Sequence, residues 1–215
     1  MSRGLRNLVA GLGLALAASS ASAETATIAA LGDSLTQGYG LAQEDGFVPQ
    51  LERWLRERGA DVDVLNAGVS GDTTRGGLAR AAWTLDSEAD AVIVTLGGND
   101  ALRGLDPAMS RSNLAGILKA ADEAGTVALL VGMKAPTNYG SDYKRAFDAM
   151  YPELAEESGV LFAEDFLAPI AAIEDRERAR RDYMQSDGIH PNADGVALIV
   201  EALGPRVLEL IGRID

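Results

Sequence analysis

The chain has no cysteine and only one histidine, His190, among its 215 residues. It therefore forms no disulfide bonds, and thiolate chemistry and cysteine-based metal sites are excluded. A single imidazole is also too few for a zinc site built from several histidines. If the protein uses an imidazole as a base, that base is His190.

Positive charge and aromatic side chains are scarce as well. Lys and Arg number 19 against 32 Asp and Glu, which gives a net charge of −13, and aromatic residues make up 5% of the chain. A surface of this sign repels nucleic-acid phosphates and anionic lipid headgroups, so we expect neither as a partner. The few aromatic residues also argue mildly against a platform that stacks on sugar rings.

The first 23 residues have the composition of a secretory signal peptide. Basic residues precede an apolar run over residues 8–18, and an Ala-Ser-Ala sequence follows, ending at Ala23. The run is shorter than the roughly 20 residues that span a bilayer, so an uncleaved anchor is the less favoured alternative. We expect cleavage after Ala23, export to the periplasm or the medium, and no stable membrane insertion of residues 24–215.

Apolar runs alternate with amphipathic stretches along the rest of the chain. Runs typical of buried strands lie at 27–31, 62–65, 91–96, 126–131 and 160–162, and helical spacing is found at 47–58, 75–87, 107–124, 141–158 and 192–210. Continuous apolar strands separated by helices indicate a parallel sheet that is covered on both faces. The pattern predicts one domain over residues 24–215, a three-layer α/β/α sandwich with a flavodoxin-like parallel sheet of about five strands.

Two of the predicted helices contain a proline beyond their first turn. Pro152 removes a backbone donor from the helix over 141–158 and predicts a kink or a split there. The pair Gly204-Pro205 predicts a break in the last helix.

Four polar motifs follow predicted strands or precede the last helix, and open α/β sheets bind ligands at the strands' carboxyl ends. They are Gly32-Asp33-Ser34-Leu35, Asn66-Ala67-Gly68-Val69-Ser70-Gly71-Asp72-Thr73-Thr74, Leu96-Gly97-Gly98-Asn99-Asp100 and Asp187-Gly188-Ile189-His190-Pro191. Each motif alone has an ordinary structural interpretation, as a helix cap, a turn or a surface histidine. Ser34, for example, could cap the helix that follows it.

Three of these residues occur in the chain order of a known catalytic triad. Ser34 precedes Asp187, which precedes His190, and triads are recognised by geometry and role. A serine hydroxyl is a poor nucleophile until a neighbouring base takes its proton. Only three positions separate Asp187 from His190, so one turn can bring the carboxylate to the imidazole.

Together, the four motifs resemble those of the SGNH (GDSL) hydrolase family, and most of all its bacterial thioesterase I, lysophospholipase L1 and arylesterase group. The resemblance covers essentially all of the mature chain. It implies that Ser34 is the nucleophile, that His190 is the general base and then the acid, and that Asp187 orients His190. It also implies an oxyanion hole made by the backbone N–H groups of Ser34 and Gly71 and the side chain of Asn99. No metal or organic cofactor is implied.

The reaction implied by the resemblance is two-step acyl transfer to water. We expect carboxylic ester hydrolysis, most of all of short-chain or aryl esters, with thioesters and lysophospholipids as further small-molecule substrates. The alternatives are a carbohydrate O-acetyl esterase or an acyltransferase with the same triad. A third, non-catalytic reading is a binder of FMN or phosphate, which leaves His190 without a role and places a phosphate on an acidic chain.

The substrate pocket is expected on the loops after the third and fourth strands. Its apolar candidates, Leu102, Leu105, Pro136 and Tyr139, suit an acyl chain or an aromatic ring, although such residues can also simply pack the loops. Asp33, beside the nucleophile, is expected to shape the turn rather than to react. The sequence makes no prediction of the oligomeric state.

Overall fold

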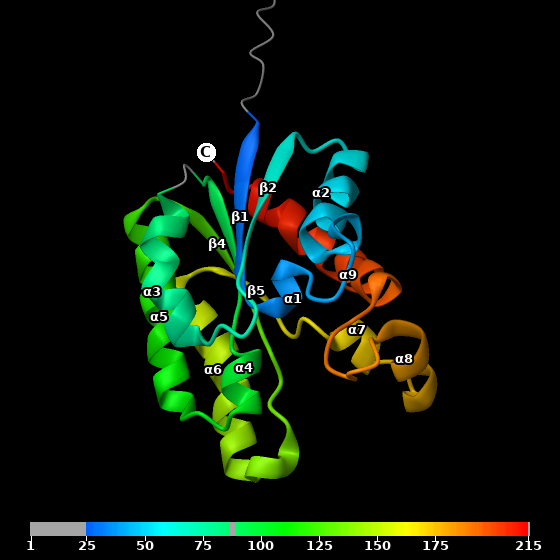
Figure 1. Ribbon diagram of the computed structural model, residues 1–215. Helices are drawn as coiled ribbons and strands as arrows, with labels where there is room; N and C mark the ends of the chain where they lie inside the picture. The colour runs from blue at the N-terminus through cyan, green and yellow to red at the C-terminus, as the bar shows by residue number, and fades with distance from the viewer. Residues whose placement is uncertain (1–24, 87–88, 215) are drawn as a thin grey trace, which may run out of the picture.

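The computed structural model of the protein describes residues 25–86 and 89–214, so the predicted signal segment lies outside the described residues. Within these ranges, five parallel strands form one sheet in the order β2-β1-β3-β4-β5 (Figure 1). The strands are β1 (Ala26–Gly32), β2 (Val62–Gly68), β3 (Ala91–Thr95), β4 (Val127–Val131) and β5 (Leu161–Ala163). This order is that of a flavodoxin-like sheet, as the sequence predicts.

Helices cover both faces of the sheet and complete the three predicted layers (Figure 1). On one face α2 (Phe47–Glu57) packs against α9 (Ala193–Ile211), and on the other α5 (Pro107–Glu123) packs between α3 (Thr74–Leu85) and α6 (Ser141–Ser158). Shorter helical segments lie in the loops: α1 (Ser34–Gln37), η1 (Gln43–Asp45), α4 (Gly98–Leu102), η2 (Thr137–Tyr139), α7 (Ala168–Ala171) and α8 (Arg176–Tyr183). None of the helices within the described ranges is both long and apolar enough to cross a membrane.

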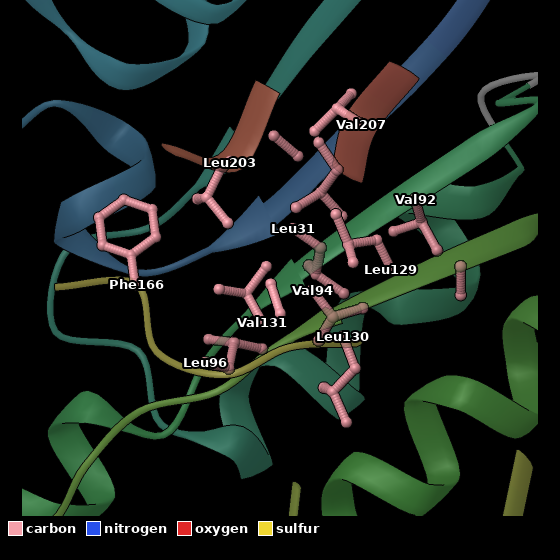
Figure 2. Close-up of a cluster of buried hydrophobic side chains, with 14 of the residues drawn as sticks. Leu31, Val92, Val94, Leu96, Leu129, Leu130, Val131, Phe166, Leu203 and Val207 are labelled. Carbon is pink, nitrogen blue, oxygen red and sulfur yellow. The ribbon is translucent and has the colours of Figure 1, made fainter. Parts of the chain in front are cut away.

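The burial of each strand follows from its place in the sheet. All five residues of β3, in the middle, are buried, whereas the edge strand β2 buries Val62 and Val64 and exposes Asp63 and Leu65. Figure 2 shows side chains of β1, β3 and β4 in one cluster with Leu203 and Val207 of α9. Burying each such side chain contributes about 1.5–3 kcal/mol. The central strands therefore hold the sheet between its two helical layers.

The last helix is continuous, so the predicted break at Gly204-Pro205 is wrong. Helix α9 runs through both residues to Ile211, because its apolar face remains buried on either side of the proline, at Leu203 and Val207. Tertiary packing of that face outweighs the hydrogen bond that the proline removes. Pro152 likewise lies inside α6 without splitting it.

Two short helices, α7 and α8, lie in a segment whose apolar residues show no helical spacing. Helix α8 is almost entirely polar and buries only Ala179. Its first turn is capped by Asp175, whose carboxylate accepts from the Arg178 backbone N–H at 2.9 Å. Periodicity of apolar residues cannot reveal such a helix, because it has no apolar face.

Gly204 provides a test of this packing. A Cβ built there would lie 2.4 Å from the Trp54 ring, and that ring is held by Glu201, which accepts from its indole N–H at 2.6 Å. We expect Gly204→Ala to lower the free energy of unfolding by up to about 2 kcal/mol, because overpacking costs about 1–3 kcal/mol and the better helix propensity of alanine offsets about 1 kcal/mol of it. Urea unfolding measures it. Gly212→Ala is the control, because the atom nearest to a Cβ added there is the Glu209 carbonyl oxygen, at an ordinary contact distance of 3.5 Å. Equal stability of the two variants would show that the Trp54 ring does not restrict position 204.

Candidate active site

The pairing of β1 with both of its neighbours brings three of the four motifs to one place. Gly32 at the end of β1 lies in register with Gly68 of β2 and with Thr95 of β3. Ser34 and Asn99 follow these strand ends within a few residues, and Figure 1 shows α1 and α4, which carry them, at the same end of the sheet. This is also where the strand order reverses, the usual ligand site of an open α/β sheet.

The nucleophile candidate sits in a turn that its neighbours define. A Cβ on Gly32 would lie 1.9 Å from the Thr36 hydroxyl oxygen, so no larger residue fits there. Asp33 caps α1, its carboxylate accepting from the Leu35 backbone N–H at 3.0 Å. Ser34 is thus the first residue of the helix and not its cap, which leaves its hydroxyl available for other contacts.

Ser34, His190 and Asp187 form a chain of hydrogen bonds. The Ser34 Oγ lies 2.8 Å from His190 Nε2, and His190 Nδ1 lies 2.6 Å from an Asp187 carboxylate oxygen. The backbone N–H groups of His190 and Ile189 donate to the other carboxylate oxygen at 3.0 and 2.9 Å. These bonds, with that from the imidazole, lower the pKa of Asp187 to about 2. The ionised Asp187 accepts a hydrogen bond from the Nδ1–H group of His190, and this leaves Nε2 to accept from the Ser34 hydroxyl.

Two residues that sequence reasoning missed, Gln185 and Tyr39, connect the segment that carries His190 (the histidine loop) to the segment that follows Ser34 (the serine loop). Gln185 donates from its side-chain amide to the carbonyls of Tyr39, at 2.8 Å, and Pro191, at 2.9 Å. The Tyr39 ring lies against the His190 ring, with 4.7 Å between centroids. Gln185 and Tyr39 are 146 positions apart in the sequence. The only sequence signal for their contact is that Tyr39 closely follows Ser34 and Gln185 closely precedes Asp187.

Asn99 follows a backbone bend that needs glycine. Gly97 has φ of +115°, and a Cβ there would lie 2.1 Å from the Tyr151 hydroxyl, which donates to the Leu96 carbonyl at 3.0 Å. The Asn99 side-chain N–H₂ group donates to Asp33 at 3.1 Å. Asn99 is therefore held by the residue that precedes Ser34.

A buried carboxylate fixes the segment between Gly71 and α3. Asp100 is 1% exposed and accepts from the Thr74 backbone N–H at 2.9 Å, the Thr74 hydroxyl at 2.6 Å and the Ser110 hydroxyl at 2.8 Å. Gly71 itself has φ of +81°, and its carbonyl accepts from Arg103 at 3.0 Å. The loop is thereby fastened to α4 and α5.

Arg80 of α3 joins the ends of two strands. Its guanidinium donates to the carbonyl of Gly32 at 2.8 Å, to that of Ala67 at 2.6 Å, and to the Asp72 carboxylate at 2.8 Å. The strand ends that lead to Ser34 and Gly71 are thus held by one side chain. Sequence reasoning gave this arginine no role, because neither its spacing nor its neighbours reveal the carbonyls that it reaches.

These motifs open onto one cavity of about 610 Å³. Ser34, Gly71, Asn99 and His190 line it. Its apolar lining comes from several loops: Leu35, Ala101, Leu102, Met133, Ala135, Pro136, Leu167, Ala171, Met184 and Ile189. No group of three or more His, Cys, Asp or Glu side chains in the described part of the chain could hold a metal ion.

The four predicted substrate-binding residues divide into two pairs. Leu102 and Pro136 line the cavity, whereas Leu105 and Tyr139 are not among its lining residues. Tyr139 instead donates from its hydroxyl to the Leu102 carbonyl at 3.0 Å, and its ring lies within 3 Å of where a Gly104 Cβ would be. Its contacts are therefore with the loop that carries Leu102.

Most of the chain, including the four motifs, matches the model of a known protein family. The model of the GDSL-like lipase/acylhydrolase family matches residues 30–198, a span that includes all four motifs. The chain belongs to this family.

Relatives in the GDSL-like lipase/acylhydrolase family are similar to the chain over most of its length. Esterase TesA of Pseudomonas aeruginosa is 36% identical, over 92% of this chain and 96% of its own. An arylesterase of Vibrio mimicus is 34% identical, over 89% of this chain and 92% of its own. The crystal structure of the psychrotrophic esterase EstA from Pseudoalteromonas sp., inhibited by monoethylphosphonate, is 30% identical, with a TM-score of 0.78 over 87% of this chain and 99% of that one.

One acidic group at this GDSL-family site has an unusual environment. Asp33 is 2% exposed, and burial raises its pKa to about 6, against the opposing effect of the hydrogen bonds from Leu35 and Asn99. A carboxyl group that is harder to ionise in the folded than in the unfolded chain stabilises the fold below its unfolded pKa. That stabilisation is lost as the pH rises through the folded value.

The raised pKa of Asp33 in the folded chain predicts how the free energy of unfolding changes with pH. A rise from 3.8 to about 6 corresponds to about 3 kcal/mol. We expect the unfolding free energy of the wild type, minus that of Asp33→Asn, to fall by about this amount between about pH 4 and 7. Urea unfolding of both proteins across this range measures it. A difference that is flat or grows with pH would show that Asp33 is not buried as described.

Proposed function

We propose that the protein is a serine hydrolase that cleaves carboxylic esters through an acyl-enzyme on Ser34. The observation that carries this proposal is the 2.8 Å contact between Ser34 Oγ and His190 Nε2, continued at 2.6 Å to Asp187. A base in contact with the hydroxyl and a carboxylate in contact with the base are what a serine needs to become a nucleophile. The esterase and arylesterase relatives support the same reaction.

In the first step, Ser34 Oγ attacks the ester carbonyl while His190 Nε2 takes the hydroxyl proton. The carbonyl oxygen becomes an oxyanion, and we assign its stabilisation to the backbone N–H groups of Ser34 and Gly71 and to the Asn99 amide. The intermediate collapses, the C–O bond to the alcohol breaks, and His190 returns the proton to that alcohol. Water then attacks the acyl-enzyme in the same manner and releases the acid and free Ser34.

The lining of the cavity favours an ester with an apolar acyl or aryl part. Met133, Leu167 and Met184 extend the apolar surface beyond the Ser34 and His190 side chains. Short-chain or aryl carboxylic esters are the proposed substrates, with thioesters and lysophospholipids as further ones. The chain's acidity disfavours polyanionic esters.

The place of this activity is proposed from the first 23 residues. Their basic, apolar and small-residue segments are typical of a cleaved secretory signal. We propose that the enzyme acts outside the cytoplasm, in the periplasm or the medium.

The proposal predicts hydrolysis that depends on two side chains. Purified protein should hydrolyse p-nitrophenyl esters, and Ser34→Ala and His190→Ala should each lower kcat by at least about 10³-fold, because either change removes the activated nucleophile. Initial rates on esters from acetate to palmitate, beside an acyl-CoA and a lysophospholipid, measure this and rank the substrates. Ser141→Ala, at an exposed helix start, is the control.

A second readout does not depend on the choice of substrate. A p-nitrophenyl alkylphosphonate should add one phosphonyl group to the wild type and none to Ser34→Ala, as intact mass shows. Turnover retained in Ser34→Ala, or a phosphonyl adduct on it, would overturn the assignment. No turnover of any tested ester, with Ser34 still modified by the phosphonate, would redirect the search to acetylated sugars.

Asn99 is expected to act mainly on the transition state. In the proposed role its amide stabilises a charge that the substrate does not yet carry, so Asn99→Ala should lower kcat about 10²–10³-fold and leave KM within about threefold. Steady-state kinetics on the best p-nitrophenyl ester separate the two parameters. An effect confined to KM would make Asn99 a substrate-binding residue instead.

A further inference from the structure

Asp33 makes two hydrogen bonds that connect different parts of the site. One carboxylate oxygen accepts from the Leu35 backbone N–H at 3.0 Å, and the other accepts from the Asn99 side-chain amide at 3.1 Å. The first bond lies within the turn that presents Ser34, and the second reaches across to α4. One side chain thus ties the nucleophile's turn to the amide of the oxyanion hole.

We propose that Asp33 is a positioning residue for the oxyanion hole, which sets the orientation of the Asn99 amide and so directs its second N–H at the substrate carbonyl. This role rests on the function proposed above. It also goes beyond the shaping of the turn that the sequence suggests for Asp33.

The two ends of the Asn99 side chain differ in what they can bond to. An Asn side chain has one N–H₂ group with two protons and one carbonyl oxygen, and either end can face a neighbour. A carboxylate only accepts hydrogen bonds, so it selects the N–H₂ end of Asn99. One N–H of Asn99 donates its hydrogen bond to Asp33. The other N–H remains free to donate to a ligand in the cavity that Asp33, Ser34 and Asn99 line together.

The turn alone does not require the Asp33 carboxylate. Ser and Asn cap helices about as well as Asp does, without placing a charge in a buried site. Asp33 is nevertheless 2% exposed, and burial raises its pKa to about 6. Ionisation of this group above pH 6 is therefore unfavourable for folding, and its use lies in accepting two hydrogen bonds at once.

The packing around Asp33 limits where the carboxylate can lie. A Cβ on Gly98 would come within 3.3 Å of the oxygen that accepts from Asn99, so the Gly98 backbone lies close beside that oxygen. On the other side the carboxylate is anchored to Leu35. Little freedom remains for the carboxylate to leave Asn99.

The test is a double-mutant cycle on kcat with Asp33→Asn and Asn99→Ala. Asp33→Asn keeps the shape and an oxygen for Leu35, but its second group is an N–H₂, which cannot accept from Asn99. We expect Asp33→Asn to lower kcat about 10- to 100-fold with KM within about twofold. If Asp33 acts through Asn99, the double variant should lie within about threefold of Asn99→Ala alone.

Two outcomes would overturn the proposal. Wild-type kcat in Asp33→Asn would show that the tie is dispensable, and losses that multiply in the double variant would show that Asp33 acts independently of Asn99. Asp106→Asn is the matched control, since Asp106 also accepts from the backbone N–H two residues on, at 2.9 Å, and lies outside the cavity lining. Its kcat should equal that of the wild type.

The cycle separates this proposal from the function on which it rests. Absence of Ser34-dependent turnover in the wild type would refute the proposed function, whereas a failed cycle on an active wild type would refute only the role of Asp33. Thermal unfolding checks that each variant is folded. If Asp33→Asn does not fold, Asp33→Ser, whose hydroxyl can still accept from Leu35, replaces it in the same cycle with the same expectation.

Discussion

The parallel pairing of β1 with β2 on one side and β3 on the other determines where the chemistry of this protein lies. Gly32, Gly68 and Thr95 end these three strands in one register. The segments that leave them must turn away from the same edge of the sheet. Ser34, Gly71 and Asn99 line one cavity because of this arrangement, and none of them depends on a long flexible loop for its place.

Asp187 and His190 reach the cavity differently, from a segment that belongs to none of the five strands. Asp187 and His190 lie between α8 and α9, and this segment is held to the serine loop by side-chain contacts, those of Gln185 above all. The site thus combines two kinds of precision. Sheet pairing fixes Ser34, Gly71 and Asn99, and a local set of hydrogen bonds fixes the His190 imidazole.

Much of this organisation could be predicted from the sequence, for identifiable reasons. The buried strands are continuous apolar runs, and the single histidine leaves only one imidazole base, whereas Ser34 and Asp187 are indicated by the resemblance of the four motifs to the family. The roles of Gln185 and Arg80 could not be predicted, because each depends on carbonyls that only the folded chain brings within reach. Leu105 is apolar and close to Leu102 in sequence, yet only Leu102 lines the cavity, since sequence spacing does not determine which loop residue faces inward.

The presence of a single imidazole has a practical consequence for spectroscopy. The ring resonances of His190 in NMR spectra need no assignment, since no other histidine contributes. The ring touches Asp187 through one nitrogen and Ser34 through the other, and it lies 4.7 Å from the Tyr39 ring. The chemical shifts of its two ring nitrogens therefore report separately on the two hydrogen bonds. The shifts of its carbon-bound ring protons report on the position of the Tyr39 ring. A single residue thus makes both hydrogen bonds of the imidazole observable while a ligand binds.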